Sequence, residues 1–181
     1  MQVITHIYMT DKKEKILKSA LELFANEGVN ATSTSKIAKI AGVSEGLIFR
    51  HFNNKKGLLN AIIESAEEKA NDLFADILKQ KDAKSVIKKT IDLPFLIKKS
   101  EYDYWKLQFK LKWEEEYNNP KKMKPLLDKL TRAFTELNYQ FPDLEAQYIS
   151  QTLESISTEL LKGNLNNQKQ FRQFLTDKYL V

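Results

Sequence analysis

Cysteine is absent from this chain of 181 residues, and glycine (five residues), proline (four) and histidine (two) are scarce. Without cysteine there is neither a disulfide framework nor thiolate chemistry, which fits a reducing cytoplasm. Few glycines and prolines favour continuous helices over strands and turns. No apolar run is long enough to span a bilayer, and the first residues, MQVITHIYM, lack the charged leader and apolar core of a secretory signal. We therefore expect an all-α, cytoplasmic protein with no membrane contact.

Residues suited to catalysis are equally few. The two histidines, His6 and His51, have no evident acid–base partner, and no phosphate-binding loop or metal-ligand spacing occurs. Glu114, Glu115 and Glu116 are consecutive, so they point around a helix and cannot converge on one site. We expect no enzyme activity, no cofactor and no metal.

The segment 32–58, TSTSKIAKIAGVSEGLIFRHFNNKKGL, predicts two short helices joined by a tight turn. Ser33 or Thr34 caps the first helix, because a hydroxyl accepts from the unpaired amides of a helix start. Gly42 ends it, since glycine adopts the left-handed conformation without steric cost, and Ser44 caps the second helix. The expected inward side chains are Ile37, Ala38, Ile40, Ala41, Leu47, Ile48 and Phe52. This is the helix-turn-helix plan, whose second helix enters the DNA major groove.

The same segment resembles the signature of the tetracycline-repressor (TetR) family of bacterial transcription regulators. The resemblance is carried by Gly42-Val43-Ser44, Gly46, Ile48-Phe49, Phe52, Asn54-Lys55 and Leu58, and upstream by Ile16-Leu17, Ala20, Leu23-Phe24, Glu27-Gly28 and Thr32. It implies an N-terminal arm (1–9), a helix-turn-helix DNA-binding domain (10–54) and a helical ligand-binding and dimerisation domain (55–181). Thr10 would cap the first helix, and whether Met1 or Met9 is the start stays open.

The family resemblance also implies a function. The expected protein is a ligand-responsive transcription regulator, commonly a repressor, that binds double-stranded palindromic operator DNA as a homodimer and is released by a small molecule. The alternative is a constitutive DNA-binding or protein-partner module on the same scaffold, with no inducer.

Charge supports a DNA-binding N-terminal part. The chain carries a net charge of +5, and up to Gly57 it contains nine Lys and Arg against five Asp and Glu. The excess positive charge therefore lies with the predicted DNA reader, where phosphate neutralisation requires it.

The candidate DNA contacts fall into two groups. Ser33, Thr34 and Lys36 lie at a helix start that can hold a phosphate, the resemblance makes Lys55 a phosphate clamp, and Lys56 is a supplementary contact. Arg50 is the expected base reader, because guanidinium bonds guanine O6 and N7 in a bidentate way. Leu47 either touches a thymine methyl group or packs inward. The outward candidates of the second helix are Ser44, Glu45, Gly46, Leu47, Phe49, Arg50 and His51.

Helical spacing predicts a long helix from Lys55 to about Gln80 that links the two domains, and further helices at 83–99, 102–117, 125–139, 144–161 and 168–180. We expect Pro94 to kink the first of these, Asn118-Asn119-Pro120 to interrupt the chain and Gly163 to end the penultimate helix. Trp105, Phe109 and Trp113 share one face of a predicted helix, and in a regulator of the family that the chain resembles, such a face is where an apolar or aromatic inducer would bind. The proposed lining is Phe74, Phe95, Tyr102, Trp105, Phe109 and Trp113. The alternative is that these aromatic side chains simply fill the core.

Two apolar stripes mark the last two predicted helices. The first is Ile149, Leu153, Ile156 and Leu160, and the second includes Phe171, Phe174 and Leu175. Two such helices from each of two subunits would close a four-helix bundle, so we expect the homodimer interface here. The alternative is that both stripes pack within one chain.

Overall fold

A computed structural model describes residues 2–114, 116–117 and 120–180, with the backbone alone at 2–10, 66, 69–70 and 120. The described chain is helical throughout, which confirms the all-α prediction, and no strand occurs in it. It divides into two compact units, described separately below: residues 1–68 with 103–111 form the first unit, and residues 69–102 with 112–181 form the second. No helix among the described residues is sufficiently long and apolar to cross a membrane.

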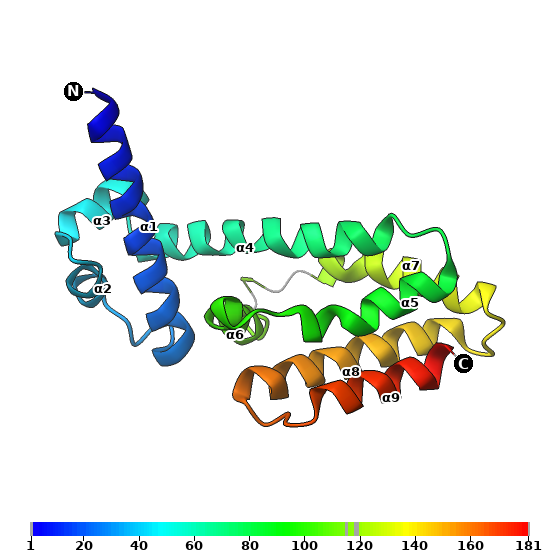
Figure 1. Cartoon of the computed structure of the whole chain (residues 1–181). Helices are drawn as coiled ribbons and strands as arrows, with labels where there is room; N and C mark the ends of the chain where they lie inside the picture. The colour runs from blue at the N-terminus through cyan, green and yellow to red at the C-terminus, as the bar shows by residue number, and fades with distance from the viewer. Residues whose placement is uncertain (1, 115, 118–119, 181) are drawn as a thin grey trace. The chain divides into compact units, whose positions relative to one another are not determined.

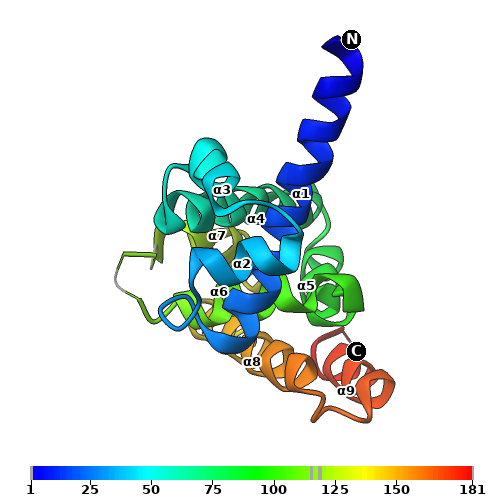
Figure 2. The ribbon, with the colours of Figure 1, turned by 90° about the vertical axis from the view of Figure 1, so that its left-hand side faces the viewer.

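The first unit contains α1 (Gln2–Glu27), α2 (Thr34–Ala41) and α3 (Glu45–Phe52). It also holds the beginning of α4 (Lys55–Leu78) and most of α6 (Tyr102–Leu111). Helix α2 packs against both α1 and α3, and Figures 1 and 2 show these three helices together. Fully buried side chains from each helix meet in its core, because the apolar positions recur on one side of every helix: Ile16, Ala20, Phe24, Ile37, Ile48 and Leu58.

The helix ends around α2 follow the sequence prediction. Ser33 is the N-cap, and its hydroxyl accepts a hydrogen bond from the backbone amide of Lys36 at 3.1 Å. Gly42 ends α2 in the left-handed conformation with φ 66°. Ser44 occupies the N-cap position of α3 without a side-chain capping bond.

Two local predictions in this unit are wrong. Helix α1 begins at Gln2, so Thr10 lies within the helix and does not cap it. Ile40 is 52% exposed, because Ile37, Ala38 and Ala41 alone complete the buried stripe of α2. Local helix signals identify a permissible start, but they do not prevent the preceding residues from continuing the helix.

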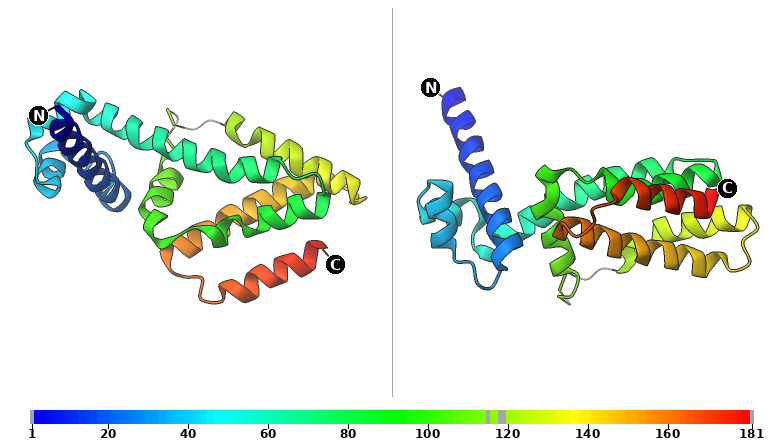
Figure 3. Two further views of the ribbon diagram at one scale, coloured as in Figure 1. Left: turned by 45° about the horizontal axis from the view of Figure 1, so that its top comes forward. Right: turned by 60° about the horizontal axis from the view of Figure 1, so that its bottom comes forward.

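The second unit contains the end of α4, α5 (Ala83–Asp92), α7 (Lys124–Glu136), α8 (Pro142–Lys162) and α9 (Gln168–Leu180). Short 3-10 helices lie at η1 (Leu93–Leu96), η2 (Lys99–Glu101) and η3 (Pro120–Met123). Helix α7 packs on α5 and α8, and α9 lies along α5 (Figure 3). The core that joins them includes Ile87, Leu130, Phe134, Ile149 and Leu175.

Two helices of the structure end six or more residues before their predicted ends. The α-helix predicted at 83–99 ends at Asp92, and Pro94 lies buried in η1, so proline ends the α-helix and does not kink it. Helix α6 ends at Leu111, well before Tyr117. Gly163 ends α8 with φ 80°, as predicted. The predicted break at 118–120 starts at residues outside the described part of the chain.

Candidate nucleic-acid interface

Helices α2 and α3 are joined by a turn that the backbone itself fixes. The amide of Val43 donates to the carbonyl of Ala38 at 3.0 Å, and the amide of Leu47 donates to the carbonyl of Ser44 at 3.0 Å. Ile48 and Phe52 bury one face of α3 against the rest of the unit. The opposite face is therefore presented outward on a short helix whose orientation is set by packing and by the turn.

The predicted contact residues of α3 divide by exposure. Ser44, Gly46, Phe49 and Arg50 are exposed, with Phe49 at 45%, whereas Glu45, Leu47 and His51 are half-buried. An added Cβ at Gly46 would meet no atom of this chain within 4 Å. Packing within the unit therefore does not require glycine at this position.

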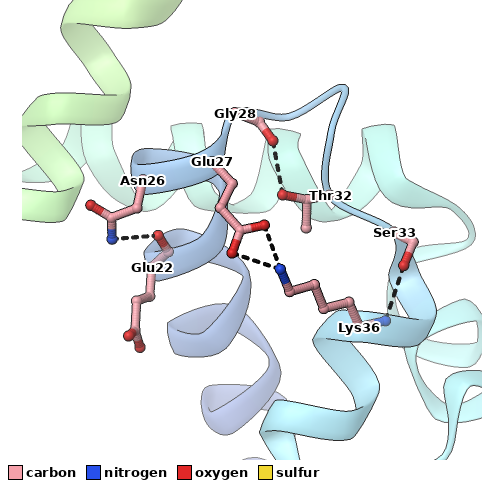
Figure 4. A network of polar contacts seen from close by, with 7 residues as sticks. All are labelled: Glu22, Asn26, Glu27, Gly28, Thr32, Ser33 and Lys36. Carbon is pink, nitrogen blue, oxygen red and sulfur yellow. Dashed lines mark hydrogen bonds and ion pairs between the residues drawn. The ribbon is translucent and has the colours of Figure 1, made fainter.

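A polar network fixes the loop between α1 and α2 (Figure 4). The Lys36 ammonium contacts both carboxylate oxygens of Glu27, at 2.7 and 2.6 Å. The Thr32 hydroxyl donates to the carbonyl of Gly28 at 2.8 Å, and the amide group of Asn26 donates to the carbonyl of Glu22 at 2.8 Å. Lys36, predicted to hold phosphate, is thus paired with a carboxylate of α1, and both side chains stay partly exposed.

Other predicted contacts also bond inside the unit. The Thr34 hydroxyl donates to Glu45 at 2.5 Å, which links α2 to α3 and gives a structural reason for a carboxylate at the start of α3. The Lys55 ammonium donates to the carbonyls of Val29 and Thr32 at 2.8 and 3.0 Å. Because an ammonium has three donors, Lys55 anchors the α1–α2 loop and keeps one donor for another partner. Lys56 is exposed.

A cleft of about 460 Å³ opens beside α3, and the sequence analysis did not identify it. We call it the α3–α4 cleft. It is lined by Lys13, Phe49, Arg50, His51, Phe52, Asn53, Gly57, Asn60, Ala61 and Glu64. Gly57 allows the close approach of α3 and α4 at its edge, since an added Cβ would collide with the carbonyl oxygen of Phe52. In the sequence, the only indication of the cleft is the spacing of residues 57, 60, 61 and 64, which places them on one face of α4.

The predicted inducer-pocket residues do not all lie in one unit. Trp105 and Phe109 are half-buried on α6 in the first unit, where the rings of Tyr104 and Trp105 pack edge to face at 5.3 Å. Phe74 and Phe95 pack against the core of the second unit, which also contains Tyr102. The expectation that Trp113 continues the face of Trp105 and Phe109 is wrong, because α6 ends before it and its side chain is 91% exposed.

The first predicted dimer stripe is buried inside the second unit. Ile149, Leu153 and Ile156 belong to its core, and Leu160 is buried as well. Leu175 is also buried, so these side chains are unavailable to a partner chain, and the alternative of packing within one chain holds for them. Phe174 differs, with 59% exposure, and Phe171 beside it is half-buried with a ring distance of 6.1 Å.

Among the described residues, no group of three or more His, Asp or Glu side chains is arranged to hold a metal ion. The first unit exposes lysine, arginine, hydroxyl and amide groups around a short helix, together with carboxylates on α1 and α4. The lysine, arginine, hydroxyl and amide groups are of the kind that bind phosphate and base edges.

Comparison with known proteins places the site within a family. Residues 16–62 match the model of bacterial regulatory proteins of the tetR family. Over 78 residues the chain is 37% identical to the uncharacterized HTH-type transcriptional regulator YvkB of Bacillus subtilis (strain 168), a stretch covering 39% of this chain and 41% of YvkB. It is 41% identical over 63 residues to the HTH-type transcriptional regulator AcrR of Shigella flexneri, covering 35% of this chain and 29% of AcrR. The chain thus spans less than half the length of these relatives.

Solved structures extend the likeness of fold to most of the chain. A putative transcriptional regulator from Saccharomonospora viridis in complex with choline matches with a TM-score of 0.68 at 21% identity, over 93% of this chain and 95% of that one. The transcriptional regulator FadR from Bacillus subtilis in complex with stearoyl-CoA matches with a TM-score of 0.62 at 21% identity, over 91% and 95%. At this identity the likeness establishes the fold.

Proposed function

The chain belongs to the tetR family of bacterial regulatory proteins by virtue of residues 16–62, and from this premise we propose that it is a cytoplasmic DNA-binding transcription regulator. The observation that carries the proposal is the exposed face of α3, held by buried Ile48 and Phe52 and by the turn at Gly42. A short helix fixed in this way can enter a major groove without reorganising the unit.

Within that groove, Arg50 is the proposed base reader, because its guanidinium is exposed and can bond guanine O6 and N7 together. Gly46 lets the backbone approach the base edges, and Ser44 and Phe49 face the flanking sugar and phosphate. Ser33, Lys55 and Lys56 supply proposed phosphate contacts, with Lys55 using its remaining donor. Thr34, Lys36 and Glu45 reach DNA only if they exchange or share their present partners.

A single reading helix covers one half-site, so we propose that a homodimer binds a palindromic operator and acts as a repressor. Phe174 on α9 and the exposed Tyr148 on α8 are available for the partner chain, whereas the stripe from Ile149 to Leu160 is not. Sedimentation equilibrium should give the mass of two chains. A monomer at micromolar concentration would overturn this part of the proposal.

Release by a small apolar or aromatic molecule completes the proposed function. The half-buried Trp105 and Phe109 on α6 support the apolar or aromatic character of the ligand. Two structures of similar fold, one in complex with choline and one with stearoyl-CoA, support only the idea that a regulator of this fold binds a ligand. A ligand releases DNA only if it binds the non-binding conformation more tightly than the DNA-binding one.

The test of DNA binding is selection of duplexes from a random-sequence library by the purified full chain, followed by affinity measurements at two salt concentrations. We expect selected duplexes to bind in a salt-sensitive way, and Arg50→Ala to weaken binding by about 1–3 kcal/mol, largely for duplexes with the contacted guanine. Arg132→Ala is the matched control, because Arg132 is an exposed arginine of the second unit. Failure to enrich any sequence would overturn the proposal.

A further inference from the structure

The α3–α4 cleft is lined by polar groups, and only Arg50, the proposed base reader, has a role in the DNA contacts proposed above. Lys13 and Arg50 bring cationic side chains to it from two helices, and Asn53 and Asn60 bring amide groups. All four are exposed, and among the described residues of the first unit Lys13 makes no hydrogen bond or ion pair. Cationic and amide donors gathered around one cleft are suited to an anion with several oxygen atoms.

Lys13 is positioned at a defined end of the cleft. Its ammonium lies 5.9 Å from the centre of the Phe52 ring, and Phe52 is the last residue of α3. The Lys13 ammonium therefore lies near the end of α3, and Arg50 and Asn53 line the same cleft. A cation over an aromatic face is held without being neutralised, so it stays able to attract an anion.

The one carboxylate that lines the cleft lies toward its other end. Glu64 follows Gly57 by seven positions along α4, a rise of about 10 Å. Gly57 borders the end of α3, since its amide bonds to Asn54 at 2.8 Å. Glu64 therefore lies roughly two helical turns along α4 from Gly57, and the anion belongs at the α3 end of the cleft.

We propose that the α3 end of this cleft binds a phosphate group of the DNA backbone next to the half-site, with Lys13 of α1 as the residue that contacts it. The inference rests on the proposed DNA-binding function and extends the DNA contacts to α1. The backbone phosphate is the anion chosen because Arg50 and His51 belong both to the cleft and to the recognition helix. A helix lying in the major groove has phosphates along both of its sides.

The experiment compares Lys13→Gln with wild type on a duplex that the wild-type chain has selected. Neutralising one phosphate contact should reduce the slope of log affinity against log salt by about 0.9 per subunit between roughly 50 and 200 mM salt. Lys12→Gln is the matched control, because Lys12 is an adjacent exposed lysine of α1 outside the cleft lining. Lys13→Arg keeps the charge and should retain the wild-type slope.

A series of duplexes with single neutral methylphosphonates identifies the phosphate. One position should weaken binding by wild type and leave binding by Lys13→Gln unchanged, because the contact is already lost in that variant. Equal slopes for Lys13→Gln, Lys12→Gln and wild type would overturn the cleft proposal while leaving the regulator intact. Absence of any selected duplex for wild type would instead overturn the proposed function.

Discussion

Gly46 and Gly57 both lie in the first unit, yet they have very different surroundings. A Cβ at Gly46 would meet open space, whereas a Cβ at Gly57 would collide with the carbonyl oxygen of Phe52. We expect Gly57→Ala to destabilise the chain by about 1–3 kcal/mol, because the backbone between α3 and α4 must move. Gly46→Ala should leave unfolding unchanged or stabilise it by up to about 1 kcal/mol, since alanine favours helix.

For Gly46→Ala, the effect on DNA binding should differ from the effect on stability. Gly46→Ala is expected to weaken binding to a selected duplex by roughly tenfold or more, equivalent to 1.4 kcal/mol, in a fully folded protein. Urea unfolding and fluorescence anisotropy measure the two effects. If Gly46→Ala bound DNA as tightly as wild type, close approach of the α3 backbone to the groove would be disproved.

At the scale of single residues, the sequence predicts those features that depend only on residues close by in the chain. The cap of α2 and the left-handed Gly42 depend on a few adjacent backbone groups. The sequence predicts a cap at Ser33 or Thr34 and an end at Gly42, and the structure has the cap at Ser33 and the end at Gly42. The pairing of Lys36 with Glu27 depends on how α2 packs on α1, and no local pattern encodes it. The sequence therefore identifies candidate DNA-contacting residues, but it does not predict the hydrogen bonds and ion pairs that these residues form within the folded chain.

At the scale of helices, the sequence predicts the order of the helices along the chain more accurately than the residues at which they end. The sequence predicts that Pro94 interrupts a helix, but a proline can either kink a helix or end it. In the structure α5 ends before Pro94, which lies in the 3-10 helix η1. Helix α6 stops at Leu111 although the sequence to Tyr117 contains no glycine or proline. Periodicity predicts this helix but does not locate its end, and Trp113 lies beyond the end of α6 and not on its face.

A bidentate ion pair joins helix α9 to the end of α5. The Arg172 guanidinium bonds both carboxylate oxygens of Asp92, at 2.6 and 2.7 Å, and Asp92 is only 17% exposed. Arg172→Lys keeps the charge but cannot reproduce this geometry, so we expect the chain to lose about 0.5–1 kcal/mol of unfolding free energy.

The matched control is Lys124→Gln, which breaks an exposed pair with Asp128 inside α7. Its cost should stay below about 0.5 kcal/mol, because such surface pairs contribute little. Urea unfolding at low salt measures both variants. An Arg172→Lys chain as stable as wild type would mean that packing of α9 on α5 suffices without the ion pair.

For the whole molecule, the all-α class was predictable because helical periodicity recurs along the chain. The partner of each apolar stripe was not. Ile149, Leu153 and Ile156 show the same spacing whether they face another chain or their own core, and here they belong to the core of the second unit, where α8 packs on α7. The same limit applies to the aromatic residues of the predicted pocket, since spacing does not state which unit a side chain joins.

Burial of tyrosine links the stability of the whole chain to alkaline pH. Burial, with the nearby Glu145 carboxylate, raises the pKa of the Tyr179 phenol in the folded state. The unfolded chain releases this proton near pH 10, before the folded chain does. Unfolding is therefore increasingly favoured as pH rises above about 10, by up to about 1.4 kcal/mol per pH unit for this group.

Tyr179→Phe removes the ionisable hydroxyl and keeps the ring that packs against Phe134 at 5.7 Å. We expect wild-type stability at neutral pH and a smaller loss between about pH 9.5 and 11, measured by urea unfolding with tyrosinate absorbance. Part of the alkaline loss of stability should persist in Tyr179→Phe, because burial also raises the pKa of Tyr139. The double variant Tyr139→Phe, Tyr179→Phe should lose less stability still at alkaline pH.

An alkaline loss of stability identical to wild type in the double variant would place its cause outside this aromatic cluster. A neutral-pH loss in Tyr179→Phe would instead assign the hydroxyl a structural bond, because only the oxygen has been removed.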